Sequence, residues 1–171
     1  MTSHLHLVCG KIAAGKSTLC ARLAEADATV LLSEDAWLSS LWPGEINALA
    51  DYARYTARLR AVMGEHITAL LRAGTSVVLD FPANTLATRQ WMRSIIDASG
   101  AAHTLHWLDL DDATCKARLR RRNAAGEHAY QAGEAEFELF SRHFVPPAAA
   151  EGFVLLVHQA GGKPEGEIPG R

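Results

Sequence analysis

The stretch Gly10-Lys11-Ile12-Ala13-Ala14-Gly15-Lys16-Ser17 directly follows the apolar run Leu5-His6-Leu7-Val8-Cys9. It has the form G-x-x-x-x-G-K-S, which is the phosphate-binding P-loop. Its two glycines let the backbone curl so that amide N–H groups point inward, towards an anion. The apolar run suits a buried strand, and Leu19 and Leu23 lie one helical turn apart in the segment that follows. The sequence therefore predicts a strand, an anion-binding loop and a helix, in this order.

The residues of this loop have distinct expected tasks. Lys16 can reach the β- and γ-phosphates of a nucleotide, and the Ser17 hydroxyl can ligate Mg²⁺. The helix that starts here offers the positive end of its dipole to the same phosphates. The residues expected to bind the nucleotide in this loop are Gly10, Ala13, Ala14, Gly15, Lys16, Ser17 and Thr18.

Composition predicts a single globular domain. The chain has 171 residues, of which 49% are hydrophobic, and a net charge of −2. This charge argues against a general nucleic-acid or anionic-membrane binder, because such proteins carry a basic excess. The longest apolar run is too short to span a bilayer, and the first strand leaves no room for a signal peptide before it. Three cysteines, Cys9, Cys20 and Cys115, fit buried reduced thiols, so a cytoplasmic location is expected.

Apolar β-rich runs alternate with helical patterns along the chain. This alternation predicts an α/β fold with a parallel sheet and helices on both faces, over residues 1–158. The Gly/Pro-rich tail, 159–171, is expected to be disordered. The predicted strands are His4–Cys9, Thr29–Leu32, Ser76–Asp80, His103–Leu108 and Phe153–His158, and the predicted helices are Lys16–Glu25, Ile46–Arg72, Thr88–Ala98, Asp112–Asn123 and Glu134–Phe144.

Two carboxylates follow predicted strands, at the edge of the sheet where open α/β folds bind ligands. Asp35 follows the second strand and is our choice for the general base that accepts a proton from a substrate hydroxyl. It could also cap a helix beginning at Ala36, and its neighbour Glu34 is the weaker candidate. Asp80 ends the apolar third strand, where a carboxylate can help to hold Mg²⁺; the alternative is an ordinary loop residue.

The helix after the fourth strand is rich in arginine. Arg118, Arg121 and Arg122 share one helical face, from which guanidinium groups can contact a nucleotide or neutralise a transferring phosphoryl group. A solvated basic helix end is the alternative. The polar segment Ala124–Tyr130 then suggests a lid that closes over the nucleotide. In the helix beyond it, the apolar stripe Phe137, Phe140 and Phe144 fits core packing.

The acceptor side of the site is expected between the second and third strands. Aromatic and basic residues in this region could line a pocket for a small molecule, or they could pack the long helix onto the sheet. Asn84 and Arg89 could also contact substrate, although Arg89 fits a surface helix position equally well. The residues placed near the acceptor are Trp37, Trp42, Tyr55, Arg54 and Arg58.

With these residues placed, the chain resembles the small P-loop kinases of the zeta-toxin, chloramphenicol phosphotransferase, gluconate kinase and polynucleotide kinase neighbourhood. It is most similar to the broad group of short bacterial ATP-binding proteins called AAA family ATPases, which are built like kinases. The resemblance covers the chain from His4 to about His158. It rests on Gly10–Ser17, Asp35, Asp80, Leu108-Asp109 with the helix through Arg118 to Arg122, and Phe144-Val145-Pro146-Pro147 with Glu151.

The resemblance implies a three-layer fold with a five-stranded parallel sheet of order 2-3-1-4-5 and a short lid. It also implies transfer of the γ-phosphoryl group of MgATP to a hydroxyl, with Lys16, Asp35, Arg118 and Arg122 as catalytic residues. Polynucleotide kinases commonly carry an Arg one turn after the base Asp, where this chain has Ala36-Trp37-Leu38-Ser39. That departure favours a small-molecule acceptor over a nucleic acid.

Three functional hypotheses follow. The first is an ATP-dependent kinase of a small hydroxylated molecule, acting as a monomer or homodimer without a membrane partner. The second is a nucleic-acid, tRNA-end or toxin-type kinase, supported only by Arg54, Arg58 and Arg60. The third is a nucleotide-switch ATPase that hydrolyses ATP without an acceptor.

Overall fold

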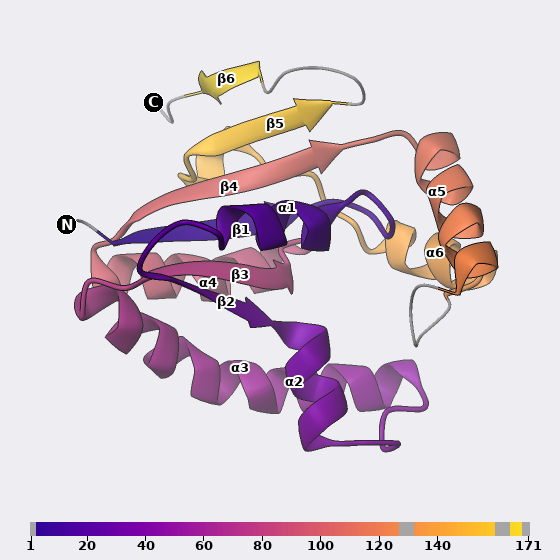
Figure 1. Ribbon diagram of the computed structural model, residues 1–171, viewed down its shortest axis with the longest axis horizontal. Helices are drawn as coiled ribbons and strands as arrows, with labels where there is room; N and C mark the ends of the chain where they lie inside the picture. Colours follow the sequence, from indigo (N-terminus) through magenta and orange to yellow (C-terminus); the bar gives the residue numbers. More distant parts are fainter. Residues whose placement is uncertain (1–2, 127–131, 160–164, 169–171) are drawn as a thin grey trace.

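The computed structural model describes residues 3–126, 132–159 and 165–168. Strands and helices alternate along the chain, as the sequence predicts (Figure 1). In chain order the elements are β1 (His4–Cys9), α1 (Lys16–Leu23), β2 (Thr29–Ser33), α2 (Glu34–Leu41), α3 (Leu49–Arg72), β3 (Ser76–Pro82), α4 (Leu86–Ser99), β4 (Ala102–Asp109), α5 (Asp112–Ala125), α6 (Glu134–Arg142), a 3-10 turn η1 (Ala149–Glu151), β5 (Leu155–Gln159) and β6 (Glu165–Ile168).

The sheet has the strand order β2-β3-β1-β4-β5-β6. The first five strands in this order are parallel to one another, which confirms the predicted parallel sheet of order 2-3-1-4-5. The central strand β1 lies between β3 and β4, so the P-loop that follows it emerges at the middle of the sheet. Parallel strands end at the same edge, and α2, α5 and α6 lie beyond that edge (Figure 1).

A sixth strand, Glu165–Ile168, falls within the tail 159–171 that the sequence predicts to be disordered; residues 160–164 and 169–171 of that tail lie outside the described residues. Gln159 ends β5, and Glu165–Ile168 pairs antiparallel with β5, with Leu155 opposite Ile168. Without this strand, β5 would present a row of unpaired N–H and C=O groups at the edge of the sheet.

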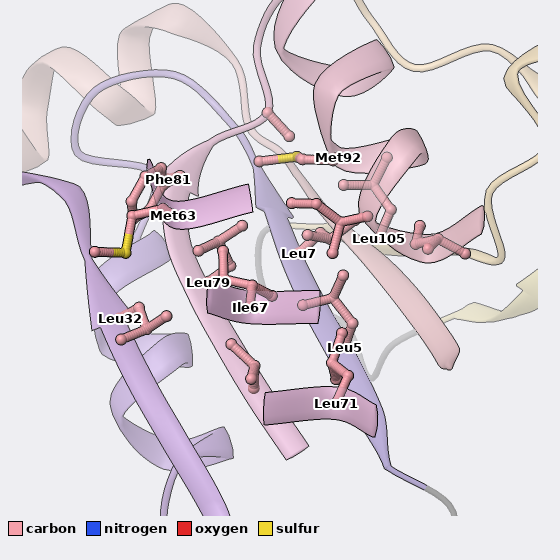
Figure 2. Packing of buried hydrophobic residues seen from close by; sticks show 14 of the residues in the cluster. Leu5, Leu7, Leu32, Met63, Ile67, Leu71, Leu79, Phe81, Met92 and Leu105 are labelled. Atoms are coloured by element: carbon pink, nitrogen blue, oxygen red, sulfur yellow. The ribbon is translucent and has the colours of Figure 1, made fainter. Parts of the chain in front are cut away.

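Helices cover the sheet on both faces. Side chains alternate along β1, so that Leu5 and Leu7 face the main core while Val8 faces α1. The main core packs the sheet against α3 and α4, which contribute Met63, Ile67, Leu71 and Met92 (Figure 2). A smaller cluster joins α1 to the opposite face through Leu19 and Cys20, beside Val8 and Val78. The sheet is therefore the middle layer of three.

Helix boundaries depend on local capping. Helix α2 was not among the predicted helices, and it begins directly at the end of β2, capped by the Ser33 hydroxyl that accepts from the Ala36 N–H. Helix α3 starts at Leu49 and not at Ile46, because Asp51 accepts from the N–H groups of Asn47 and Ala48 and sets the first turn. None of the helices described here has the length and apolar character needed to cross a bilayer.

Candidate active site

The backbone conformation of the P-loop depends on glycine at positions 10 and 15. A Cβ on Gly10 would lie 3.1 Å from the carbonyl oxygen of Leu108 and 3.2 Å from the Cβ of Ala14. Gly15 has a φ of 100°, in the left-handed region that favours glycine. The loop therefore approaches the end of β4 more closely than a side chain at Gly10 would allow.

Helix α1 begins with the features of an anion site. Its N-cap is Gly15, no side chain hydrogen-bonds to the cap, and its first turn carries no acidic residue. The first N–H groups of a helix lack intrahelical partners, and the helix dipole adds positive potential there. Ser17 and Thr18 are both exposed at this end. A phosphate group fits this end of the helix in both charge and hydrogen bonding.

Lys16 lies folded back over the loop. Its ammonium donates to the carbonyl oxygens of Gly10 at 2.6 Å and Lys11 at 2.8 Å. Burial lowers the pKa of Lys16, while the negative charges of Asp80 and Asp35 act in the opposite direction. The two carboxylates chosen from the sequence are therefore both close enough to act on the Lys16 ammonium.

Asp80 lies within β3, which continues to Pro82, and is paired in register with Ser33 of β2. It also lies close enough to α1 for its charge to act on the pKa of the Cys20 thiol. Burial raises the pKa of that thiol, and the Asp80 charge raises it further. Cys20 lies one turn after Lys16, so Asp80 is held beside the first turn of α1, where Mg²⁺ binding was predicted.

The described residues near the P-loop offer two candidate ligands for a Mg²⁺ ion. Among residues 3–126, 132–159 and 165–168, no group of three or more His, Cys, Asp or Glu side chains could hold a metal ion. Ser17 and Asp80 supply one hydroxyl and one carboxylate. Mg²⁺ usually takes one or two protein oxygens and completes its shell with phosphate and water, so these two residues fit it.

Asp35 is exposed in the first turn of α2. The helix cap is Ser33, so the interpretation of Asp35 as the cap of a helix starting at Ala36 is wrong. The cause is local, because the strand already ends at Ser33 and its hydroxyl satisfies the Ala36 N–H. Asp35 therefore lies just beyond the carboxyl end of β2, in the first turn of α2.

Glu34, the weaker candidate for the base, has a structural role. Its side chain is buried and accepts hydrogen bonds from the Tyr52 hydroxyl and the Arg60 guanidinium. Burial and the Glu34 charge both raise the pKa of Tyr52. Both oxygens of Glu34 are thus used in attaching α2 to α3.

The arginine helix α5 lies against the P-loop. Arg118 donates from Nη1 to the carbonyl oxygen of Ala14 at 3.2 Å, which places this guanidinium beside the loop. Arg122 is partly buried one turn further along α5, and Arg121 is exposed. No hydrogen bond is observed from either of these two to the described part of the loop, so their contact with nucleotide stays a prediction.

Helices α5 and α6 pack on the loop through a second apolar cluster. Ala14 of the loop is buried with Leu119 of α5 and Phe137 of α6. Arg120 pairs with Glu134 and Lys116 with Glu138, which joins the two helices on their outer side. The predicted lid, Ala124–Tyr130, includes the end of α5 and Gly126; its remaining residues lie outside the described residues. Helices α5 and α6 therefore both pack against the P-loop at Ala14.

The predicted acceptor residues form a packed cluster. Tyr55 is 5% exposed, and its ring lies 4.8 Å from that of Trp42. The guanidinium groups of Arg54 and Arg58 lie 4.7 and 5.7 Å from the centre of the same tyrosine ring. These contacts match the packing alternative for Tyr55. Trp37 lies on α2, two residues after Asp35, and is exposed.

Arg89 corrects both sequence interpretations, because it is neither at the surface nor on a substrate-facing position. It is fully buried and donates to Glu151, to the carbonyl oxygens of Ala83 and Val145, and at 3.4 Å to that of Pro146. Asn84 also differs from its prediction, since its side-chain amide contacts Gly10 of the P-loop. The sequence signal for both was a polar residue that follows the predicted third strand, and the partners Glu151 and Gly10 lie 62 and 74 positions away from Arg89 and Asn84.

A family model described as an AAA domain matches residues 5–147. The chain belongs to this AAA domain family. The match includes the P-loop, both candidate carboxylates and the arginine helix. It agrees with the resemblance to small P-loop kinases that the sequence motifs indicated. No curated protein sequence matches the chain.

Solved structures share the fold of this AAA domain at low sequence identity. A protein from Chloroflexus aurantiacus j-10-fl that is itself only a candidate kinase superposes with a TM-score of 0.71 at 23% identity, over 92% of this chain and 85% of its own. Kti12 from Chaetomium thermophilum, in complex with ADP-AlF3, gives 0.68 at 17% identity, over 92% and 89%. The Mycobacterium tuberculosis APS kinase CysC, with AMPPNP and APS, gives 0.61 at 19% identity, over 95% and 91%. The fold is that of P-loop kinases.

Proposed function

We propose that the protein is an ATP-dependent phosphotransferase that moves the γ-phosphoryl group of MgATP to a hydroxyl of a small molecule. The observation that carries the proposal is the P-loop with Lys16 folded over it and Arg118 donating to it, while Asp80 lies in β3 and Asp35 directly follows β2 of the same parallel sheet. A cation, an anion-binding helix end and a carboxylate within reach of an acceptor are the parts that phosphoryl transfer needs.

In the proposed reaction, Asp35 accepts the proton of the acceptor hydroxyl. The acceptor oxygen then bonds to the γ-phosphorus while the bond from that phosphorus to the bridging oxygen breaks, and ADP leaves. Lys16 turns from the loop carbonyls to the phosphates, and Arg118 is close enough to the loop to stabilise charge on the transferring group. Bound at Ser17 and Asp80, Mg²⁺ would neutralise phosphate charge and orient the donor.

The proposed acceptor is small and carries no phosphate of its own. Arg60 is paired with Glu34, the neighbour of Asp35 in the chain, and Arg54 is paired with Asp51 within α3. These are two of the three arginines on which a nucleic-acid acceptor depended. An acceptor phosphate would have to compete with the buried Glu34 for the Arg60 guanidinium, whereas a neutral hydroxyl compound would not.

The test is a screen of hydroxylated small molecules with labelled ATP, comparing the wild type with Asp35→Asn. The proposal expects acceptor-dependent labelling that falls by about 100-fold or more in Asp35→Asn while MgATP affinity is kept. Asp97→Asn, an exposed carboxylate paired with Arg93 on α4, is the matched control and should keep full activity. Full turnover in Asp35→Asn would show that the base is wrongly assigned, and hydrolysis without any acceptor dependence would favour a switch ATPase.

A further inference from the structure

The side-chain amide of Asn84 is matched to the backbone of Gly10. Its Oδ1 accepts from the Gly10 N–H at 2.9 Å, and its Nδ2 donates to the Gly10 carbonyl oxygen at 2.8 Å. Exchanging the two ends of the amide would place donor against donor and acceptor against acceptor, so the orientation is determined by its partners. Asn84 thus binds both polar groups of the first residue of the P-loop, which is buried.

The Gly10 carbonyl has a second donor, the Lys16 ammonium, at 2.6 Å. A carbonyl oxygen has two lone pairs, and here both are used. If Lys16 turns towards phosphates, it leaves this oxygen. A buried carbonyl without any hydrogen-bond partner is strongly destabilising, so the Asn84 bond matters more after Lys16 has turned than before.

We propose that Asn84 is a positioning residue of the P-loop, which keeps the Gly10 carbonyl hydrogen-bonded while Lys16 engages a bound nucleotide. The inference rests on the nucleotide binding that the proposed function includes. It does not depend on phosphoryl transfer or on the identity of the acceptor.

The backbone around Asn84 is itself held on both sides. Arg89 donates to the Ala83 carbonyl at 2.9 Å, and the Ala83 N–H donates to the Val8 carbonyl at the end of β1. The Val145 N–H donates to the carbonyl of Asn84 at 2.9 Å. Arg89 is itself buried and paired with Glu151, so the backbone that carries the Asn84 side chain is fixed in position.

The test is an equilibrium titration of the full chain with MgATP in the absence of any acceptor, followed together with the unfolding temperature of the nucleotide-free protein. Asn84→Ala is expected to weaken MgATP binding about tenfold or more, because the bound state then contains an unpaired carbonyl. Asn47→Ala is the matched control. This variant also loses a side-chain hydrogen bond to a backbone carbonyl, that of Gly44, but the bond lies on the exposed loop before α3. Asn47→Ala should therefore bind MgATP within twofold of the wild type.

Asn84→Leu fills nearly the same space without hydrogen bonds, and it serves if Asn84→Ala does not fold. MgATP affinity within twofold of the wild type in a folded Asn84 variant would overturn the inference, even if the variant is less stable. A wild-type protein that binds no MgATP would also overturn the inference. Weakened binding in the Asn84 variants supports the inference even where the acceptor screen finds no phosphoryl transfer, because the titration contains no acceptor.

Discussion

Arg60 and Glu34 form an ion pair that joins α3 to the first turn of α2. Nε and Nη2 of Arg60 donate to the same oxygen of Glu34, at 3.1 and 2.9 Å, and Tyr52 donates to the other oxygen at 2.7 Å. The Glu34 side chain is 1% exposed. Because Asp35 follows directly in the chain, this pair also fixes the direction in which the backbone reaches the proposed base.

Removing the partner of this buried carboxylate should be costly. Arg60→Ala is expected to lower the free energy of unfolding by about 3–5 kcal/mol, because it leaves the charge of Glu34 buried and unpaired by a cation. Urea unfolding measures this change. Arg54→Ala is the control, since Arg54 and Asp51 form an exposed pair within α3, worth about 0.5 kcal/mol or less. Equal losses in the two variants would show that the Arg60 pair is no more than a surface contact.

Gly10 should not tolerate a side chain. In Gly10→Ala the new methyl group meets the Leu108 carbonyl and the Ala14 Cβ, so the loop or the end of β4 must move. We expect a loss of about 1–3 kcal/mol in unfolding free energy from overpacking, together with much weaker MgATP binding in a calorimetric titration. Gly133→Ala has an ordinary φ of −87° and its nearest neighbour at 4.0 Å, so it should change MgATP binding little. Unchanged MgATP binding in Gly10→Ala would mean that the close approach is unimportant for the donor site.

The fold and the position of the P-loop in it could be predicted because their signals are local. The P-loop motif specifies a strand, a loop and a helix within 20 residues, and the apolar runs of β1 and β3 mark strands buried on both faces. Asp35 and Asp80 follow from their positions near strand ends, where parallel strands bring polar residues together. Nothing in these inferences needs a contact between distant residues.

The parts that could not be predicted are those that depend on distant partners. Arg89 looked like a surface helix residue because its partner Glu151 is 62 positions away. Asn84 looked like a substrate contact because its partner Gly10 is 74 positions away. Strand β6 has a Gly/Pro-rich context, and only the open edge of β5 explains its pairing. Tyr55 illustrates an ambiguity that sequence leaves open, since an aromatic residue suits a pocket or a core equally.

Arg89 should be a strong determinant of stability. Its guanidinium donates to Glu151 and to three backbone carbonyls, so Arg89→Met leaves both the carboxylate and the carbonyls without this partner. A loss of about 3–5 kcal/mol is expected by urea unfolding. Arg89→Lys keeps the charge but not the planar fork, and should recover only part of the loss. Arg93→Met, on the exposed side of α4, is the control and should lose about 1 kcal/mol or less. Full recovery by lysine would show that charge alone matters at this position.

Three histidines form a row across β1, β4 and β5. Nδ1 of His6 lies 3.1 Å from Nε2 of His106, and Nδ1 of His106 lies 3.1 Å from Nε2 of His158. Burial lowers the pKa of His106 to about 3 and that of His6 to about 4, and the neighbouring imidazoles add to both shifts. These side chains are therefore neutral in the folded protein at pH values where the unfolded chain already protonates them.

The sign of the resulting pH dependence follows directly. Between about pH 6.5 and pH 4 the unfolded state binds more protons, so stability falls as the pH falls, by up to about 1.4 kcal/mol per pH unit for each fully buried histidine. His6 contributes less because it is partly exposed. Urea unfolding between pH 7 and pH 5 should show this slope, and His106→Gln should reduce it by removing one titrating group. A slope in His106→Gln equal to that of the wild type would mean that the row does not set the acid sensitivity.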